Sequence, residues 1–245
     1  MIFGFPHRHF RRTDSTNERA KELALAGGPG GLVVTATEQT AGRGRRGSAW
    51  FAPPGACLLY SGLLRPFDSE RDRLLPLAVP LAVCEAAESI APVRCQVKWP
   101  NDVWIDERKF AGVLVEARPE EAWAVIGVGL NVAVPQENFP AELRETATSL
   151  LPTEAEGGMP PGGAPGVRRT LQALNDALGR WVEADDETVL GAYRPRDALA
   201  GREVSWDGGE GTALEVDEQG HLVVATADGK RVRLGAGEVH LAVER

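Results

Sequence analysis

The sequence is poor in the residues that build disulfide frameworks and metal sites. It has three cysteines, an odd number without C-x-x-C spacing, and four histidines that lie near the two ends of the chain. Neither a disulfide scaffold nor a metal site built from protein side chains alone is expected. Cys57, Cys84 and Cys95 are expected to be reduced core residues of a cytoplasmic protein.

Long apolar runs are missing as well. The first five residues are largely apolar, but Pro-His-Arg follows, so the run is too short for the core of a signal peptide. No stretch approaches ~18 consecutive apolar residues. The most apolar segment, residues 74–91, contains two prolines and two glutamates. Neither export nor a membrane span is expected.

An excess of positive charge is also absent, since the formal net charge is -8. Non-specific binding to nucleic acid requires a broad basic face, so duplex DNA is not an expected partner. Against this background, residues 42–47 place three arginines and three glycines in one short loop. Glycine lets a backbone approach a ligand, and a guanidinium offers a planar fork of donors. The loop is therefore suited to a phosphate or carboxylate, and a solvated basic turn is the alternative interpretation.

The same loop satisfies G-x-G-x-x-G at Gly42, Gly44 and Gly47, but its surroundings do not fit a dinucleotide or kinase site. Residues 48–55 end in Pro-Pro-Gly and cannot open the helix that would face a pyrophosphate. The kinase tripeptides His-Arg-Asp and Asp-Phe-Gly do not occur, and neither does a G-x-x-x-x-G-K-[ST] loop.

The pattern of apolar residues predicts an α+β fold with a mixed, mostly antiparallel sheet. A capping-box spacing at residues 15–18 begins one predicted helix, and residues 74–91 form a second, buried one with Pro80 as a break or kink. Strands are predicted at residues 32–37, 57–64, 93–99, 103–105, 109–116 and 122–132. A tight turn is predicted at residues 106–107.

The composition and the spacing of apolar residues change in the last part of the sequence. Residues 154–166 are rich in glycine and proline and predict a loop, and Leu171, Leu174, Leu178 and Trp181 share one face of a predicted helix. Short predicted strands follow at residues 202–206, 211–216, 221–225, 230–234 and 239–243. We expect a main domain at residues 1–195 and a small β-barrel domain at residues 196–245.

Several motifs together resemble the biotin–protein ligases. They are DSTN at residues 14–17, the arginine loop at 42–47, KWPND at 98–102, KFAGVLVE at 109–116 and GVGLN at 127–131. The resemblance covers essentially the whole chain. It implies a catalytic domain of the class II aminoacyl-tRNA synthetase and biotin ligase type, followed by a small SH3-like β-barrel. It also implies an enzyme that couples biotin to ATP, with Mg²⁺, as biotinyl-5′-AMP and then biotinylates a lysine of a biotin carboxyl-carrier domain.

The resemblance implies catalytic roles for Lys109, Arg45, Arg43 and Asp102. The carboxylate of biotin must approach the α-phosphate of ATP, and two anions at contact repel unless cations lie between them. The arginines and Lys109 would supply those cations, the arginines from a mobile loop and Lys109 from a rigid strand. Asp102 is expected to orient the lysines or to engage the acceptor amine.

The resemblance also implies two sets of binding residues. Biotin contacts are expected from Ser15, Thr16, Asn17, Gln39, Arg43, Gly44, Arg45, Lys109 and Gly112, with Gly129 as a further small pocket position. Nucleotide contacts are expected from Arg45, Arg46, Lys98, Asn101, Asn131 and Trp123. Short hydroxyl and amide side chains suit the donors and acceptor of a ureido ring. Plain structural roles compete with these: a helix cap for residues 15–17, a turn at 101–102 and a core position for Trp123.

Two departures from the family pattern carry expectations of their own. Ser48 stands where many relatives have another arginine, which predicts looser retention of the adenylate. Only 13 residues precede the first motif. They leave no room for the helix-turn-helix domain of repressor-type members, so regulation by direct DNA binding is not expected. A monomer and a homodimer both remain open.

Two other functions compete with the ligase. A lipoate or octanoate protein ligase or transferase would share the fold and also modify carrier lysines, but the arginine loop beside Trp-Pro-Asn-Asp is not expected in it. A non-catalytic adenylate- or RNA-binding module would use the arginines for a phosphate backbone. The acidic C-terminal segment and the lack of a second basic stripe with aromatics argue against that module.

Overall fold

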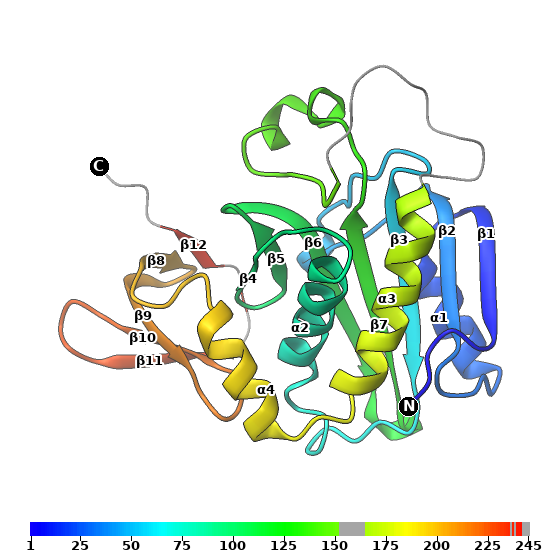
Figure 1. The fold of residues 1–245 in the computed structure, drawn as a ribbon. Coiled ribbons are helices and arrows are strands. Elements are labelled where there is room, and N and C mark those ends of the chain that lie inside the picture. Colours follow the sequence, from blue (N-terminus) through cyan, green and yellow to red (C-terminus); the bar gives the residue numbers. More distant parts are fainter. Residues whose placement is uncertain (152–164, 236, 238, 242–245) are drawn as a thin grey trace.

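The computed structural model describes residues 1–151, 165–235, 237 and 239–241 (Figure 1). Its main sheet has seven strands in the order β1-β2-β3-β7-β6-β5-β4. They are β1 (His7–Thr13), β2 (Val33–Gln39), β3 (Cys57–Leu64), β4 (Cys95–Lys98), β5 (Asp102–Ile105), β6 (Arg108–Arg118) and β7 (Trp123–Asn131). β1 and β2 are parallel, and the other neighbours are antiparallel. The predicted mixed, mostly antiparallel α+β fold is confirmed.

Helices cover both faces of this sheet (Figure 1). They are α1 (Thr16–Leu25), α2 (Leu75–Glu88), α3 (Pro165–Trp181) and α4 (Asp186–Tyr193). α2 and α3 pack on each other and on one face, whereas α1 packs on β2, β3 and β7 from the opposite face. The side of α1 that faces the sheet begins with Thr16 and Asn17, so polar residues enter the molecule at the start of this helix.

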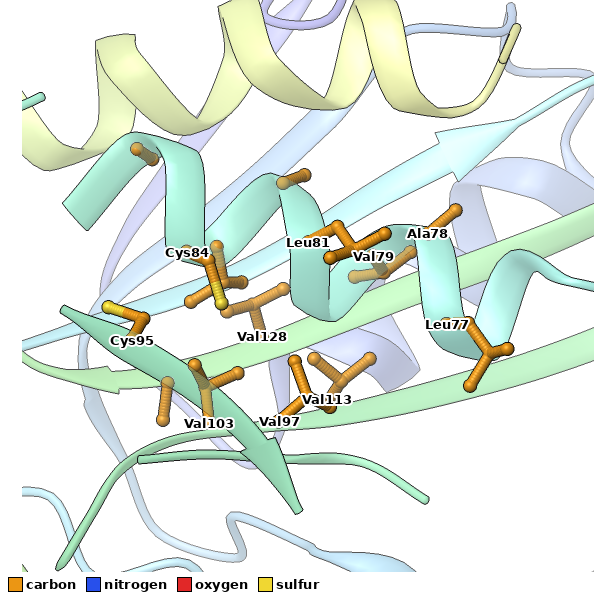
Figure 2. Close-up of a cluster of buried hydrophobic side chains, with 14 of the residues drawn as sticks. Leu77, Ala78, Val79, Leu81, Cys84, Cys95, Val97, Val103, Val113 and Val128 are labelled. Carbon is orange, nitrogen blue, oxygen red and sulfur yellow. The ribbon is translucent and has the colours of Figure 1, made fainter. Parts of the chain in front are cut away.

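The main core lies between α2, α3 and the sheet. Figure 2 shows Cys84 of α2 directed toward Val128 of the sheet, and Leu77, Leu81 and Val113 belong to the same buried cluster. α2 is apolar on nearly every side because α3 covers the side that the sheet does not. The predicted helix is confirmed, and it continues through Pro80 rather than ending there.

A second sheet forms the C-terminal part of the chain, with the strand order β11-β10-β9-β8-β12. Its strands are β8 (Glu203–Trp206), β9 (Gly209–Val216), β10 (Leu222–Ala225), β11 (Arg231–Leu234) and β12 (Val239–Leu241). All five match predicted strands, although residues 242–243 lie outside the described residues. The loop predicted at residues 154–166 also lies outside them, except for residues 165–166, which belong to α3. The indole of Trp99 donates a 3.0 Å hydrogen bond to the carbonyl of Gly220, and Ala198 bonds β4 at Val97, so the two sheets are tied together.

The sequence pattern missed two elements of this fold and predicted one turn correctly. β1 and α4 were not predicted, because β1 is a charged edge strand with one neighbour and α4 has only eight residues. The predicted tight turn is confirmed: Asp106 and Glu107 both have positive φ, 49° and 60°. Two successive left-handed residues match the twist of the β5–β6 hairpin.

Candidate active site

A polar chamber opens beside the first turn of α1. Ser15, Thr16 and Asn17 are each about 95% buried, and Ser61 of β3 is fully buried beside them. The Ser61 hydroxyl lies 2.8 Å from Thr16 Oγ1 and 2.5 Å from Asn17 Oδ1, and Thr16 also donates to Gln39 Oε1 through Oγ1 at 3.0 Å. Three oxygen–oxygen contacts thus share the two hydroxyl hydrogens of Ser61 and Thr16.

The predicted cap at Ser15 is wrong in one respect. Ser15 occupies the N-cap position with extended backbone angles, but its side chain makes no capping hydrogen bond. The neighbouring Asp14 carboxylate accepts from the Ser15 amide at 2.7 Å, and Thr16 gives its own amide to Gln39 at 2.6 Å. Ser15 therefore lines the chamber with a hydroxyl that the helix backbone does not use.

The arginine loop forms a small hairpin across the mouth of this chamber. Trp50 donates its amide to the Gly42 carbonyl at 3.0 Å, and Arg43 pairs with Ala49 as an isolated bridge. At the tip, the Ser48 hydroxyl donates to the Arg45 carbonyl at 2.9 Å. Local hydrogen bonds thus hold the loop that the sequence predicts to be mobile.

The loop arginines point to different partners. Arg43 forms an ion pair with Glu18 of α1. Arg45 reaches toward Asn101 of the Trp-Pro-Asn-Asp turn, with 3.5 Å between Nη1 and Oδ1. Arg46 lines the same chamber and has a positive φ of 53°. The hairpin therefore distributes positive charge from the start of α1 to the start of β5.

Lys109 and Asp102 stand at the far end of the polar chamber. The Lys109 ammonium lies 2.6 Å from the Asp102 carboxylate and 5.6 Å from the centre of the Trp50 ring. The Lys109 backbone donates to the Thr146 carbonyl at 2.8 Å and accepts from the Thr148 amide at 3.0 Å. These bonds, together with the strand pairing, give Lys109 the rigid mount that its place beside a hairpin turn predicts.

A second, more apolar chamber begins on the other side of this ion pair. Phe51, Trp104, Phe139 and Leu143 contribute apolar walls, and Asn131 adds an amide. The two chambers share a wall made by Ala49, Trp50, Lys98, Asp102, Lys109 and His240. Lys109 therefore faces the space where contents of the two chambers would meet.

The structure brings nearly all the predicted site residues together. The polar chamber is lined by Ser15, Thr16, Asn17, Gln39, Arg43, Gly44, Arg45, Arg46, Lys98, Asn101, Asp102, Lys109, Gly112 and Gly129. Asn131 lies in the apolar chamber, where its amide also donates to Thr148 at 3.1 Å. Trp123 lies in neither chamber: it is 1% exposed in the core between α1 and the sheet, so the structure corrects its predicted nucleotide contact to a core position.

Sequence reasoning missed three contributions to the site. Ser61 is the one small polar side chain in the otherwise mostly apolar strand Cys57–Leu64, a signal that could have revealed it. Trp50 lies three residues after the arginine loop, and its buried ring nitrogen has no hydrogen-bond partner among the described residues. Gly237, Val239 and His240 reach the polar chamber from the C-terminal sheet, which no local motif indicates.

The described residues also bear on three expectations from composition. Cys57, Cys84 and Cys95 are free and buried, as predicted. In these segments, no three side chains of the metal-binding types His, Cys, Asp and Glu cluster together. Likewise, none of the helices described here combines the length and apolar character needed to span a membrane.

The fold and the site define a ligand-binding protein with a polar and an apolar chamber joined at a lysine–carboxylate pair. Residues 9–132 match the profile of the biotin/lipoate A/B protein ligase family. The chain belongs to this family, and the match contains every motif from the start of α1 to the end of β7.

Individual relatives extend the likeness over the remaining chain. A biotin–[acetyl-CoA-carboxylase] ligase of Mycobacterium tuberculosis is 34% identical over 239 residues, 93% of this chain and 86% of that protein. The bifunctional ligase/repressor BirA of Bacillus spizizenii is 38% identical over 146 residues, which span 58% of this chain but only 45% of that protein. The biotin protein ligase of Aquifex aeolicus in complex with biotin and ATP superposes with a TM-score of 0.79 at 29% identity, over 97% of this chain and 99% of that one.

Proposed function

We propose that this protein is an ATP-dependent biotin–protein ligase, which forms biotinyl-5′-AMP and transfers the biotinyl group to a lysine of a biotin carboxyl-carrier domain. The observation that carries the proposal is the position of Lys109 on the wall shared by the polar and apolar chambers. A cation is needed where a carboxylate meets a phosphate, and this is the place where two ligands would meet. The biotin- and ATP-bound Aquifex relative supports the same assignment.

The polar chamber is the proposed site for the ring system of biotin. Ser61, Thr16 and Asn17 offer more acceptor positions than hydrogens, since two hydroxyl hydrogens serve three contacts. A cyclic urea supplies two N–H donors and one carbonyl acceptor, which complements such a cluster. The Ser15 hydroxyl, unused by its helix, is available to donate to the urea carbonyl.

The first step takes place at the shared wall. A carboxylate oxygen of biotin forms a bond to the α-phosphorus of ATP, the bond to the β-phosphate oxygen breaks, and pyrophosphate leaves with the electron pair. Lys109, Arg43 and Arg45 reduce the repulsion between the two anions and stabilise the charge of the transition state. The hairpin over the polar chamber excludes water from the resulting mixed anhydride.

The second step uses the same wall. A neutral lysine amine of the acceptor attacks the biotinyl carbonyl, the bond to AMP breaks, and AMP leaves. The attacking nitrogen must lose a proton as the amide forms. We assign this proton to the Asp102 carboxylate, and its position on the shared wall, 2.6 Å from Lys109, supports that role.

The apolar chamber is the proposed nucleotide site. Phe51, Trp104 and Phe139 provide flat or apolar surfaces for an adenine ring, and the Asn131 amide lies among them to read a polar edge. Arg46, Lys98 and Asn101 lie in the polar chamber near the shared wall, where the phosphates would be. Mg²⁺ enters bound to those phosphates, whose charge it neutralises.

The finer organisation of the chain belongs to the same proposal. We infer a catalytic domain at residues 1–195, of the class II synthetase and biotin ligase type, and a C-terminal SH3-like domain at residues 196–245. The antiparallel order β11-β10-β9-β8-β12 supports the second of these. Three free, buried thiols support a cytoplasmic location.

A direct assay separates the ligase from its nearest competitor. The full chain is incubated with ATP and Mg²⁺ and with either biotin or lipoate, and pyrophosphate release is measured. Biotin-dependent release, followed by labelling of a biotin carboxyl-carrier domain, is the expected result. Release with lipoate alone would favour the lipoate-type ligase, and no release with either acid would contradict both.

A further inference from the structure

A carboxylate stands behind the polar chamber and contacts the asparagine that faces it. Asn17 Nδ2 donates to Glu116 Oε2 at 2.8 Å and lies 3.5 Å from the carbonyl oxygen of Leu114. Asn17 Oδ1 points away from that carboxylate: it lies 2.5 Å from the buried Ser61 hydroxyl and next to Gly127, which lines the chamber together with Asn17. A side chain on Gly127 would clash with this amide, so the glycine leaves the space that Asn17 occupies.

The orientation of an asparagine amide is not determined by its shape. The carbonyl oxygen and the amino group are nearly equal in size, so rotation by half a turn exchanges an acceptor for a donor with little steric change. Glu116 and the Leu114 carbonyl can only accept hydrogen bonds. Both therefore select the orientation in which Nδ2 faces them and Oδ1 faces the chamber.

Lys21 keeps Glu116 in the form that makes this selection. Its ammonium lies 2.9 Å from Glu116 Oε1 and 2.7 Å from Glu18 Oε1. Burial raises the pKa of Glu116, but the hydrogen bonds from Asn17 and Lys21 outweigh burial and hold that pKa below its ordinary value. A protonated Glu116 could donate to Asn17 Oδ1 and permit the reversed amide, whereas the ionised form cannot.

We propose that Glu116 is a positioning residue for ligand selection, which acts by fixing the Asn17 carbonyl oxygen toward the polar chamber so that the chamber binds a ring N–H donor. This inference rests on the proposed function, in which the donor is a ureido N–H of biotin. Glu116 contacts the ligand only through Asn17, so it affects binding of the acid and leaves the chemistry at Lys109 unchanged.

Glu116→Gln tests the proposal, because glutamine keeps the shape of the side chain but can both donate and accept. The expected result, in pyrophosphate-release kinetics at saturating ATP, is a rise of about tenfold in the KM for biotin, the loss expected for one misoriented hydrogen bond. The kcat and the KM for ATP stay within about twofold of the wild-type values. Glu38→Gln is the matched control, since Glu38 is also ion-paired and partly exposed but lies on β2 with Arg12 as its partner.

A double variant provides the rescue. In Asn17→Asp with Glu116→Gln, the new glutamine donates to the new aspartate, so an acceptor oxygen again faces the chamber and the summed charge of the pair is unchanged. Recovery of most of the lost biotin affinity supports the proposal. An unchanged biotin KM in folded Glu116→Gln, an equal rise in Glu38→Gln, or no recovery in the double variant overturns it.

These outcomes are separable from failure of the proposed function. If the wild-type chain releases pyrophosphate with biotin and the variants behave alike, only the role of Glu116 is wrong. If the wild type does not respond to biotin at all, the ligase assignment is wrong instead. Thermal unfolding of each variant shows whether it is folded, and the charge-preserving double variant keeps the test open if the single variant is not.

Discussion

The Lys109 ammonium lies 2.6 Å from the Asp102 carboxylate, across the hairpin that joins β5 to β6. Asp102 is the first residue of β5 and Lys109 the second residue of β6, so the backbone of both is held by the sheet. The Trp50 ring, 5.6 Å from the same ammonium, closes the pair from the loop side. A ligand anion at this point would compete with Asp102 for the Lys109 ammonium. In its absence, Asp102 holds that ammonium at the wall between the chambers.

Replacing Lys109 removes that cation with little effect on folding. We expect Lys109→Gln to slow biotin-dependent pyrophosphate release by about 10²–10³-fold, because charge stabilisation in the transition state is lost. A partly exposed ion pair contributes only about 0–1 kcal/mol to stability, so the melting temperature changes little.

Lys230→Gln is the matched control for this substitution. Lys230 is also ion-paired, 2.6 Å from Asp228, but it lies on the C-terminal sheet's surface with a side chain that is 79% exposed. Its variant is expected to release pyrophosphate at the wild-type rate. Near-normal activity in folded Lys109→Gln would refute the role given to Lys109.

Two glycines provide a pair of opposite predictions. A Cβ at Gly127 would collide with the Asn17 amide, whereas a Cβ at Gly191 in α4 meets no atom within 4 Å. Gly127→Ala is expected to raise the KM for biotin about tenfold or more, because Asn17 must move. Gly191→Ala is expected to stabilise the protein by about 0.5–1 kcal/mol through helix propensity, with unchanged kinetics. Steady-state kinetics and urea unfolding of both variants check this, and equal biotin KM values would contradict it.

Ser48 gives a prediction about the intermediate. Its hydroxyl closes the tip of the arginine hairpin by donating to the Arg45 carbonyl at 2.9 Å, but it brings no positive charge to the adenylate. We expect Ser48→Arg to slow the release of biotinyl-5′-AMP severalfold, since a guanidinium adds charge-assisted bonds to phosphate. Rapid filtration of enzyme loaded with labelled adenylate measures the rate. Equal rates for the two proteins remove the idea.

Glu88 predicts how stability depends on pH. Burial raises its pKa, but hydrogen bonds from Arg196, at 2.6 and 2.8 Å, and from the Cys95 amide hold the pKa below the ordinary value. As pH falls below about 4.3, the ordinary glutamate value, the unfolded chain binds more protons than the folded one. The free energy of unfolding therefore falls with decreasing pH through this window.

Glu88→Gln should flatten that part of the profile. Urea unfolding of both proteins from about pH 7 to about pH 3 compares the slopes. The variant is expected to have a lower free energy of unfolding than the wild type at neutral pH. This difference in free energy narrows at lower pH, where the wild-type carboxylate becomes protonated. A constant difference across the range would contradict the linkage to Glu88.

Local patterns predicted much of the fold because each pattern had a physical cause near in sequence. The turn at Asp106 and Glu107, the buried helix around Pro80 and the five C-terminal strands all follow from residue type and spacing, and all are present. β1 escaped prediction because an edge strand needs no apolar alternation. Trp123 was assigned to the nucleotide because aromatic chemistry suits both a core and a ligand, and only its neighbours decide between them.

The sequence by itself determined which chemical groups are present and the family to which they belong, because the motifs are short runs whose residue types and order do not depend on packing. Tertiary structure alone decided which groups face one another. It placed Glu116 behind Asn17, Ser61 between two side chains of α1, and His240 on the wall that also contains Lys109. Such pairs join residues far apart in the chain, and the register of the sheet and the seating of α1 on it set their distances.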